Sequence, residues 1–310
     1  MKINLANIKK AKNLLNKSEC VAIPTETVYG LAGNAYSDHA CRKIFRLKKR
    51  PKNNPLIVHY YDLKKVKEDC ILNDNFLKIF KKLSPGPITF ILNLKTNSKI
   101  SKIATNKKNT LAVRFPKHPI ARSLLKELKF PLAAPSANIS SRLSAVTSND
   151  VKDDFGKKIK YILEGGRSNI GVESTIIDLR KKPKILRLGG LDIKTIQKIL
   201  RKKILLNINP SKISVPGQFK IHYSPGIPIR LNVKKIKKDE AYLMIKKKKL
   251  NRPNYYFLSK KGSLKEAAKN LYSTLRKIKK NKYKSIAVSK IPNRGLGKTI
   301  NDRLLRASKF

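Results

Sequence analysis

The first residues whose types could do chemistry lie in FRLKKRPKNNPLIVHYYD, residues 45–62, where a run of cations precedes an apolar segment. If residues 39–50 form a helix, Lys48 lies near the centre of its apolar face, whereas most of the other cations lie on the solvent side. An ammonium that points toward a core needs an anion or a route to water. Pro51 forces Arg50 out of the helical conformation, so its guanidinium can turn away from the solvent face. We therefore predict that Lys48 and Arg50 hold phosphate, with Lys48 reaching solvent along its stem as the alternative.

Two apolar strand patterns each carry a single polar residue. His59 lies toward the carboxyl end of PLIVHYY, where open α/β sheets place their ligands, although a purely structural histidine remains the alternative. Arg114 lies inside LAVRF, and a buried guanidinium requires a bidentate carboxylate or phosphate partner. Because the chain has only 19 Asp and Glu, an internal partner is scarce. This scarcity favours a bound anionic substrate at Arg114.

Two segments read as turns that present polar groups. PLAAPSANISSRLS offers Ser136, Asn138 and Ser144, and GVESTIIDL places Ser174 at the start of a strand. Neither is a hydrolase signature, since G-x-S-x-G and a Ser/His/Asp set are absent, and capping or turn formation is the alternative role. RGLGKT ends like a phosphate-binding P-loop, but Pro292 stands where the first glycine is required. We therefore exclude a P-loop.

Hydrophobic periodicity predicts the elements that must position these residues. Helices are expected at 5–15, 37–49, 73–83, 118–128 and 192–202. Strands are expected at CVAIP, PLIVHYY, ITFILNL, LAVRF, PLAAP, KYILE, STIIDL and KILRL. This mixture predicts an α/β domain over 1–203. A linker rich in Pro, Gly and Ser follows over 204–228, and long ordered loops are often functional. A smaller Rossmann-like α/β domain without the glycine fingerprint is expected over 229–310.

Composition limits the class of protein without assigning a function. The formal charge of +53 predicts salt-sensitive attraction to polyanions such as RNA, but a lysine-rich composition spread over the whole chain is the alternative. Cys20, Cys41 and Cys70 are odd in number and lack metal-ligand spacing, which favours a reducing compartment. The N-terminus lacks a signal-peptide pattern, and no apolar run approaches the roughly 20 residues that span a bilayer. We expect a cytoplasmic protein without a membrane partner.

The chain contains, in this order, PTETVYGLAGNA, KKRPKNNPLIVH, SPGPITF, LAVRFPKHP, AAPSAN, GVESTIIDL, LRLGG, PGQFKIHYSP and GLGKTINDRLLRAS. In order and spacing it resembles the threonylcarbamoyl-AMP synthase family, in the long form with a YrdC-like catalytic domain, a linker and a Rossmann-like domain. The resemblance implies a twisted mixed sheet in the first domain. It also implies that L-threonine, bicarbonate and ATP, with Mg²⁺, give L-threonylcarbamoyl-AMP and pyrophosphate. The product would feed N6-threonylcarbamoyladenosine formation in tRNA through a downstream threonylcarbamoyl transferase machinery, and the protein itself could contact tRNA.

The resemblance also implies roles for individual residues. The positions that match the family's L-threonine pocket are Thr27, His59, Arg114, Ala134 and Ser174. The positions that match its ATP contacts are Lys48, Arg50, Asn54, Thr110, Ser136, Ser144, Arg187 and Tyr223. Lys48 and Arg50 would take the catalytic part, and Tyr223 would close over the nucleotide. No residue is assigned as a metal ligand, and Glu26 and Glu173 flank the pocket with no role beyond a possible water or metal contact.

The implied chemistry suits these residue types. The threonine amine adds to CO₂ derived from bicarbonate, and an oxygen of the resulting carbamate attacks the α-phosphorus of ATP. Such a step needs orientation, charge neutralisation and exclusion of water rather than a protein nucleophile. Ser84 in SPGP, Leu188 in LRLGG and the LAGNA segment depart from the family pattern, which affects packing around the site.

Two other functions stay open at the level of sequence. A tRNA or double-stranded RNA binding module on the same fold, without synthase activity, would explain the basic charge, although basic patches with interleaved aromatics are not concentrated anywhere. An ATP-dependent carbamoyl transferase that acts on another amine would share the nucleotide site and differ at the threonine pocket.

Overall fold

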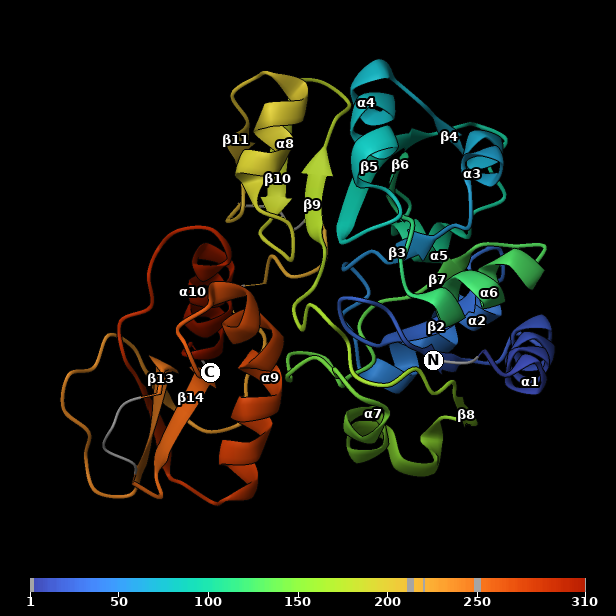
Figure 1. The fold of residues 1–310 in the computed structure, drawn as a ribbon. Helices are drawn as coiled ribbons and strands as arrows, with labels where there is room; N and C mark the ends of the chain where they lie inside the picture. The colour runs from blue at the N-terminus through green and yellow to red at the C-terminus, as the bar shows by residue number, and fades with distance from the viewer. Residues whose placement is uncertain (1–2, 211–214, 220, 248–251, 310) are drawn as a thin grey trace.

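The computed structural model describes residues 3–210, 215–219, 221–247 and 252–309, so residues 211–214 and 220 of the expected linker lie outside the described residues. The chain forms a mixed α/β structure with one large mixed sheet and one small sheet, which confirms the predicted fold class (Figure 1). Among the helices of the described residues, none has the length and apolar character needed to cross a membrane.

The large sheet mixes parallel and antiparallel neighbours. Its strands are β1 (Val21–Ile23), β2 (Gly30–Asn34), β3 (Ile57–His59), β4 (Cys70–Ile71), β5 (Ile88–Leu94), β6 (Thr110–Arg114), β7 (Leu132–Ala133), β8 (Tyr161–Ile162), β9 (Thr175–Asp178), β10 (Lys184–Arg187) and β11 (Leu205–Leu206). They follow the order β11-β10-β9-β5-β6-β3-β7-β2-β1-β8, and β4 pairs with β5 off this path. β3 and β6 are parallel, with His59 opposite Arg114 at their carboxyl ends. The register therefore places two of the expected site residues side by side.

Helices surround this sheet. They are α1 (Leu5–Asn16), α2 (Asp38–Lys48), α3 (Leu63–Asp69), α4 (Asp74–Leu83), α5 (Lys102–Thr105), α6 (Pro119–Glu127), α7 (Ser148–Phe155), the 3₁₀ turn η1 (Gly156–Lys158) and α8 (Ile193–Leu200). α2 begins after Ser37, whose hydroxyl accepts a hydrogen bond from the Ala40 amide. It ends where Lys49 adopts a left-handed conformation with φ of 50°. Lys48 is buried on the apolar face, as the helical projection predicts.

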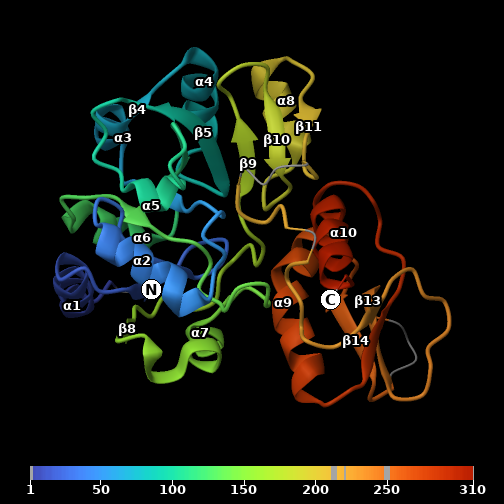
Figure 2. The same ribbon diagram turned by 180° about the vertical axis from the view of Figure 1, so that it is seen from behind.

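The second sheet is small and wholly parallel. It contains β12 (Ile229–Arg230), β13 (Glu240–Lys246), β14 (Tyr255–Ser259) and β15 (Ser285–Val288) in the order β12-β15-β13-β14. Its helices are α9 (Leu264–Lys280) and α10 (Leu296–Ala307). Both views show α9 on the side of the small sheet that faces the larger part of the molecule (Figures 1 and 2). Val28 and Val172 of the larger part belong to the same buried cluster as Leu271 and Leu275 of α9. The two parts therefore share a hydrophobic core.

Some elements differ from the sequence expectation. β2 falls where the sequence was interpreted as a polar turn, because the small residues of GLAGN carry little strand propensity and pairing with β1 and β7 decides the outcome. α3, α5 and α7 are short helices that the periodicity did not show. Asp62, Ser101 and Thr147 cap their amino ends with side-chain hydrogen bonds. Inside the expected linker, β11 pairs in parallel with β10.

Candidate active site

A cavity lies at the carboxyl ends of β3 and β6, and linker residues complete its wall. The expected residues Arg50, His59, Arg114, Ala134, Ser136, Arg187 and Tyr223 all line it. The sequence reasoning missed Thr25, Pro216, Gly217 and His222, which also line it. The structure therefore gathers residues from across the chain around one space. Six expected residues are not part of this wall, and their positions are described below: Thr27, Lys48, Asn54, Thr110, Ser144 and Ser174.

Arg114 is fixed by an internal acidic partner. Its guanidinium donates to Glu26 Oε1 over 2.8 Å and to the Thr27 hydroxyl over 2.6 Å. Burial opposes ionisation of Glu26, but the charge and hydrogen bond of Arg114 outweigh it and lower the pKa of Glu26. The scarcity of acidic residues favoured a bound anion as the partner of Arg114, but the fold supplies an internal carboxylate. Arg114 Nε has no hydrogen-bond partner among the described residues, so the guanidinium keeps one donor for a ligand.

His59 and Thr27 flank this guanidinium. His59 is buried and its Nδ1 lacks a hydrogen-bond partner among the described residues. Burial, and then the charge of Arg114, hold the pKa of His59 well below its usual value, so the imidazole is neutral. The Thr27 hydroxyl also contacts the Thr25 hydroxyl at 2.8 Å. Ala134 borders the same space because its amide donates to Ile57 O over 2.8 Å. Arg114, His59 and Thr25 line the cavity and offer it a cation, a neutral imidazole and a hydroxyl, whereas Thr27 contacts Arg114 without lining the cavity.

Lys48 satisfies its charge in a way that neither sequence alternative anticipated. Its side chain is 1% exposed, and Nζ donates to the backbone carbonyls of Ser136, over 2.6 Å, and of Asn138. Burial, and then the charge of Arg50, hold the pKa of Lys48 well below its usual value. An ammonium has three donors, so one remains after these two bonds. Lys48 also fastens the loop that brings Ser136 into the cavity wall.

Arg50 and Asn54 form the turn that follows α2. Arg50 donates from Nε to Asn54 O over 3.0 Å and from Nη2 to Pro55 O over 2.9 Å. Burial, and then the charge of Arg187, lower the pKa of Arg50 to about 9. Asn54 is buried, and its Oδ1 lacks a partner among the described residues. The turn therefore aims Arg50 into the cavity while its own carbonyls hold the guanidinium in place.

Arg187 joins the large sheet to the linker. Its Nη2 donates to Ser174 O over 2.9 Å and to the Ser174 hydroxyl over 3.1 Å, and its Nη1 donates to Pro216 O over 3.2 Å. Ser174 is therefore held beside the cavity through Arg187. The linker's His222 and Tyr223 complete the wall. Burial lowers the pKa of His222 to about 3, so this second imidazole is also neutral.

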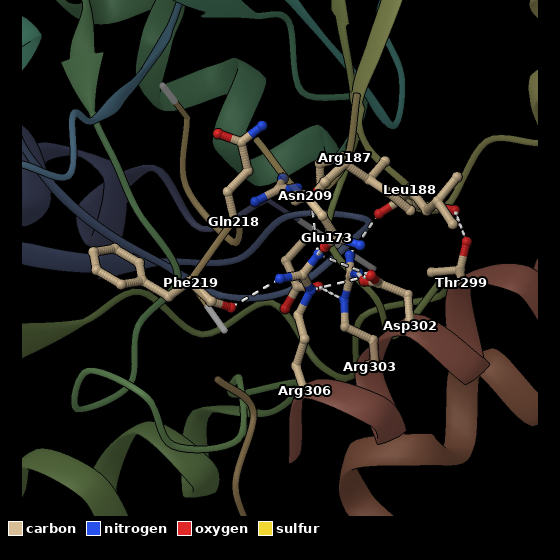
Figure 3. A network of polar contacts seen from close by, with 12 residues as sticks. Glu173, Arg187, Leu188, Asn209, Gln218, Phe219, Thr299, Asp302, Arg303 and Arg306 are labelled. Atoms are coloured by element: carbon tan, nitrogen blue, oxygen red, sulfur yellow. Dashed lines mark hydrogen bonds and ion pairs between the residues drawn. The ribbon is translucent and has the colours of Figure 1, made fainter. Parts of the chain in front are cut away.

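Ser144 lies behind the wall rather than in it. Its hydroxyl donates to Glu173 Oε1 over 2.5 Å. Arg303 Nε of α10 donates to Glu173 Oε2 over 2.8 Å (Figure 3). Burial opposes ionisation of Glu173, but Arg303 and then Arg187 outweigh it and lower the pKa of Glu173 to about 2. The sequence reasoning gave Arg303 no role. Its local sequence offered no signal, because the partner is 130 residues away in the chain.

Thr110 lies at the opposite end of β6 from Arg114, in a second pocket. Pro55, Leu186 and Val215 line this second pocket with it. Arg187 and Pro216, the next residues after Leu186 and Val215 along the chain, face the first cavity. The two pockets therefore lie on either side of the same short segments.

The acidic residues near the cavity are committed to cations. Glu26 pairs with Arg114 and Glu173 pairs with Arg303. Within the described ranges, no group of three or more His, Cys, Asp or Glu side chains could hold a metal ion. Mg²⁺ keeps several waters and often binds through substrate phosphates with one or two carboxylates. A metal ion bound to either of these carboxylates would compete with the cation that the carboxylate pairs with.

Comparisons with known proteins identify the family of the chain. The family described as telomere recombination matches residues 13–189, and the family described as threonylcarbamoyl-AMP synthase, C-terminal domain, matches residues 191–309. The threonylcarbamoyl-AMP synthase of Pyrococcus abyssi is 32% identical over 333 residues, which cover 98% of this chain and 94% of the relative. That of Bacillus subtilis is 34% identical over 327 residues, with the same two coverages. The chain belongs to the threonylcarbamoyl-AMP synthase family, in its long two-domain form.

A solved structure of the same family matches this chain over its whole length. The crystal structure of Pyrococcus abyssi Sua5 complexed with L-threonine superimposes with a TM-score of 0.91 at 30% identity, and covers 100% of this chain and 96% of that one. The likeness spans both sheets, so family membership does not rest on the larger part alone. The named relatives support the conclusion that the chain is an enzyme that makes an AMP-linked intermediate.

Proposed function

We propose that this chain synthesises L-threonylcarbamoyl-AMP and pyrophosphate from L-threonine, bicarbonate and ATP. The observation that carries the proposal is the pair of Arg114 and His59, which the pairing of β3 with β6 brings together in the wall of a cavity that Arg50 and Arg187 also line. The Thr27 hydroxyl lies 2.6 Å from Arg114. A cationic pocket for a small amino acid thus adjoins two buried cations suited to phosphate. The relative from Pyrococcus abyssi was solved with L-threonine, which supports this choice of amino acid.

In this proposal the amino acid carboxylate binds Arg114, whose Nε has no hydrogen-bond partner in the described part of the chain and can donate to the ligand. Thr27 and the neutral His59 then contact the polar groups of the amino acid, because a hydroxyl and an imidazole can each donate or accept a hydrogen bond. Ala134 and Ser174 complete the pocket from the backbone side. A pocket of this kind discriminates by hydrogen bonding, so an amine without a carboxylate should bind poorly.

The nucleotide would occupy the region on the other side of Arg187. Arg50 and Arg187 neutralise the phosphates, and Lys48 adds its remaining donor. Asn54 and Ser136 contribute polar atoms at the same turn. The second pocket, with Thr110, takes the nucleoside, since Leu186 and Val215 line it directly beside residues that face the first cavity. Tyr223 and the linker close the space over the ligand.

The chemistry follows from this placement. The threonine amine attacks CO₂ derived from bicarbonate and loses a proton, which gives a carbamate. A carbamate oxygen attacks the α-phosphorus of ATP, and the bond to pyrophosphate breaks. The cations stabilise the charge on the phosphates, and the closed linker keeps water from the labile carbamate. Mg²⁺ bound to the nucleotide would add further charge neutralisation.

The product is a reactive acyl-adenylate, so a transferase must consume it. We assign this role to a threonylcarbamoyl transferase machinery that modifies adenosine in tRNA to N6-threonylcarbamoyladenosine. Direct contact between this chain and tRNA is a separate proposal from the synthase reaction, and the basic charge favours it. A role restricted to RNA binding leaves the clustering of Arg50, Arg114 and Arg187 in a cavity without a purpose.

The test is to incubate the purified full chain with ATP, Mg²⁺, L-threonine and ¹³C-labelled bicarbonate, and to identify the product by mass spectrometry. We expect a product that contains AMP, threonine and one labelled carbon. L-Serine in place of L-threonine is the matched control for the methyl group. Binding of nucleotide without a labelled adduct under these conditions would overturn the proposal and favour the RNA-binding alternative.

A further inference from the structure

We propose that Arg303 of the small domain is a positioning residue of the active site, which fixes Glu173 and Tyr223 so that the cavity can accept a triphosphate. The inference rests on the proposed function. It assigns a specific duty to α10, which contributes no residue to the cavity wall itself.

Arg303 is the centre of a buried network that joins the two domains (Figure 3). Its side chain is 1% exposed. Nε donates to Glu173 Oε2 over 2.8 Å, and Nη2 donates to Leu188 O over 2.6 Å. The guanidinium carbon also lies 4.6 Å from the centroid of the Tyr223 ring, which is a cation–π contact. One side chain therefore holds a carboxylate, a backbone carbonyl and a linker aromatic at once.

The electrostatic consequence concerns Glu173, because this carboxylate lines the cavity. A negative charge in the wall of a phosphate site repels the ligand unless a cation neutralises it. Arg303 supplies that cation from behind the wall. The Ser144 and Tyr272 hydroxyls donate to the same carboxylate but carry no charge. Without Arg303, the next strongest cationic partner of Glu173 is Arg187, which would be drawn from the ligand.

The same face of α10 also holds the linker. Arg306 Nη1 donates to Phe219 O over 2.8 Å, and its Nη2 donates to Ile208 O over 3.0 Å, so one side chain ties two positions of the linker region together. Asp302 accepts from Arg306 Nε over 3.0 Å and pairs with Arg303 through its other oxygen. Arg306, which holds the linker, and Glu173, whose carboxylate lines the cavity, are therefore parts of one ion-pair network. An active site assembled in this way requires both domains.

The experiment compares Arg303→Gln with Arg276→Gln in the full chain. Arg276 of α9 is a matched control, because it also crosses the domain boundary, where it donates to Asp154 Oδ2 over 2.8 Å and to Leu143 O over 2.8 Å, without lining the cavity. We expect Arg303→Gln to raise both KM and the calorimetric Kd for ATP at least tenfold, with the KM for threonine changed less than threefold. Arg276→Gln should lower thermal stability and leave both nucleotide constants within threefold.

Two further variants separate positioning from simple loss of structure. Arg303→Lys retains the charge and should keep the Kd for ATP within about threefold of wild type. The double variant Glu173→Gln with Arg303→Gln removes the unpaired carboxylate and should bind ATP more tightly than Arg303→Gln alone. Equal losses in Arg303→Gln and Arg276→Gln, or no recovery in the double variant, would overturn the inference. The Kd for ATP is measured without turnover. If the wild-type chain binds ATP but makes no product, the proposed function is contradicted. The Kd values of the variants still test the role of Arg303 in that case.

Discussion

Arg114 and Glu26 form a buried ion pair with 2.8 Å between guanidinium nitrogen and carboxylate oxygen, and both side chains are almost fully enclosed. The pair orients Arg114 toward the cavity before any ligand is present. Glu26 is itself held, because its second oxygen accepts the Lys117 amide over 2.9 Å. The guanidinium therefore has a fixed position and a remaining donor, which is what recognition of an amino acid carboxylate requires.

Arg114→Lys tests this recognition. Lysine keeps the charge but not the planar fork, so it cannot hold Glu26, Thr27 and a carboxylate together. We expect the KM for threonine to rise at least tenfold while the Kd for ATP stays within threefold. Arg122→Lys is the control, because Arg122 lies outside the cavity and contacts Tyr61. Steady-state kinetics with varied threonine provide the measurement, and an unchanged KM would argue against Arg114 as the carboxylate ligand.

The substitution Gly217→Ala tests whether Tyr223 of the linker closes over the nucleotide. The φ of Gly217 is +87°, and an added Cβ would lie 2.6 Å from the Tyr223 hydroxyl and 2.8 Å from Arg187 Cδ. Gly262 has the same φ, but its nearest atom is at 3.6 Å on the Lys246 side chain. Both alanine variants therefore share a backbone cost of about 1 kcal/mol, and only Gly217→Ala adds the clash. We expect calorimetry to show ATP affinity at least tenfold weaker for Gly217→Ala and unchanged for Gly262→Ala. Equal affinities would mean that Tyr223 does not close the site.

Lys48→Met tests the phosphate turn. Methionine fills the buried volume but leaves the carbonyls of Ser136 and Asn138 without this donor, which should lower the free energy of unfolding by about 1–3 kcal/mol. We expect ATP binding to weaken more than tenfold, as measured by calorimetry. Lys43→Met on the same helix is the control, since Lys43 pairs with Glu19 away from the cavity. Retention of full ATP affinity in Lys48→Met would restrict Lys48 to a structural role.

Stability should fall in mild acid because of the buried neutral histidines. The pKa of His222 is about 3 in the folded chain because of burial, against 6.5 as its ordinary value. The stability that this depressed pKa contributes is complete above pH 6.5 and is lost as the pH falls from 6.5 toward 3, since the unfolded chain binds the proton first. Each pH unit in this range costs up to about 1.4 kcal/mol for one such group. His222→Gln should reduce the loss in Tm between pH 7.5 and pH 5. An identical loss in both proteins would show that His222 is not buried in the neutral form.

The sequence predicted the elements that depend on local periodicity. α2 and α4 have clear apolar faces, and their bounds lie close to the expected ranges of 37–49 and 73–83. The buried position of Lys48 also followed from helix geometry. β2 was missed because its strand character comes from pairing with β1 and β7 rather than from its own residues. Propensity is a weak guide for short segments of small residues that neighbours hold in place.

Contacts between distant segments account for the rest of what the sequence missed. The partners of Arg114 and Glu173 are 88 and 130 residues away, and neither spacing has a pattern that a single sequence reveals. Because acidic residues are scarce, an internal partner for Arg114 was improbable, yet Glu26 pairs with Arg114 in the fold. Thr110 and Ser144 lie outside the main cavity for the same reason, since their places depend on packing rather than on motif spacing.

The central claim is tested most directly by pyrophosphate release from ATP and Mg²⁺ in reactions that contain threonine and bicarbonate, either one alone, or neither. We predict release only when both are present, with a large loss in Arg114→Lys that high threonine concentration restores. Release that proceeds without threonine or without bicarbonate would contradict the proposed synthase reaction.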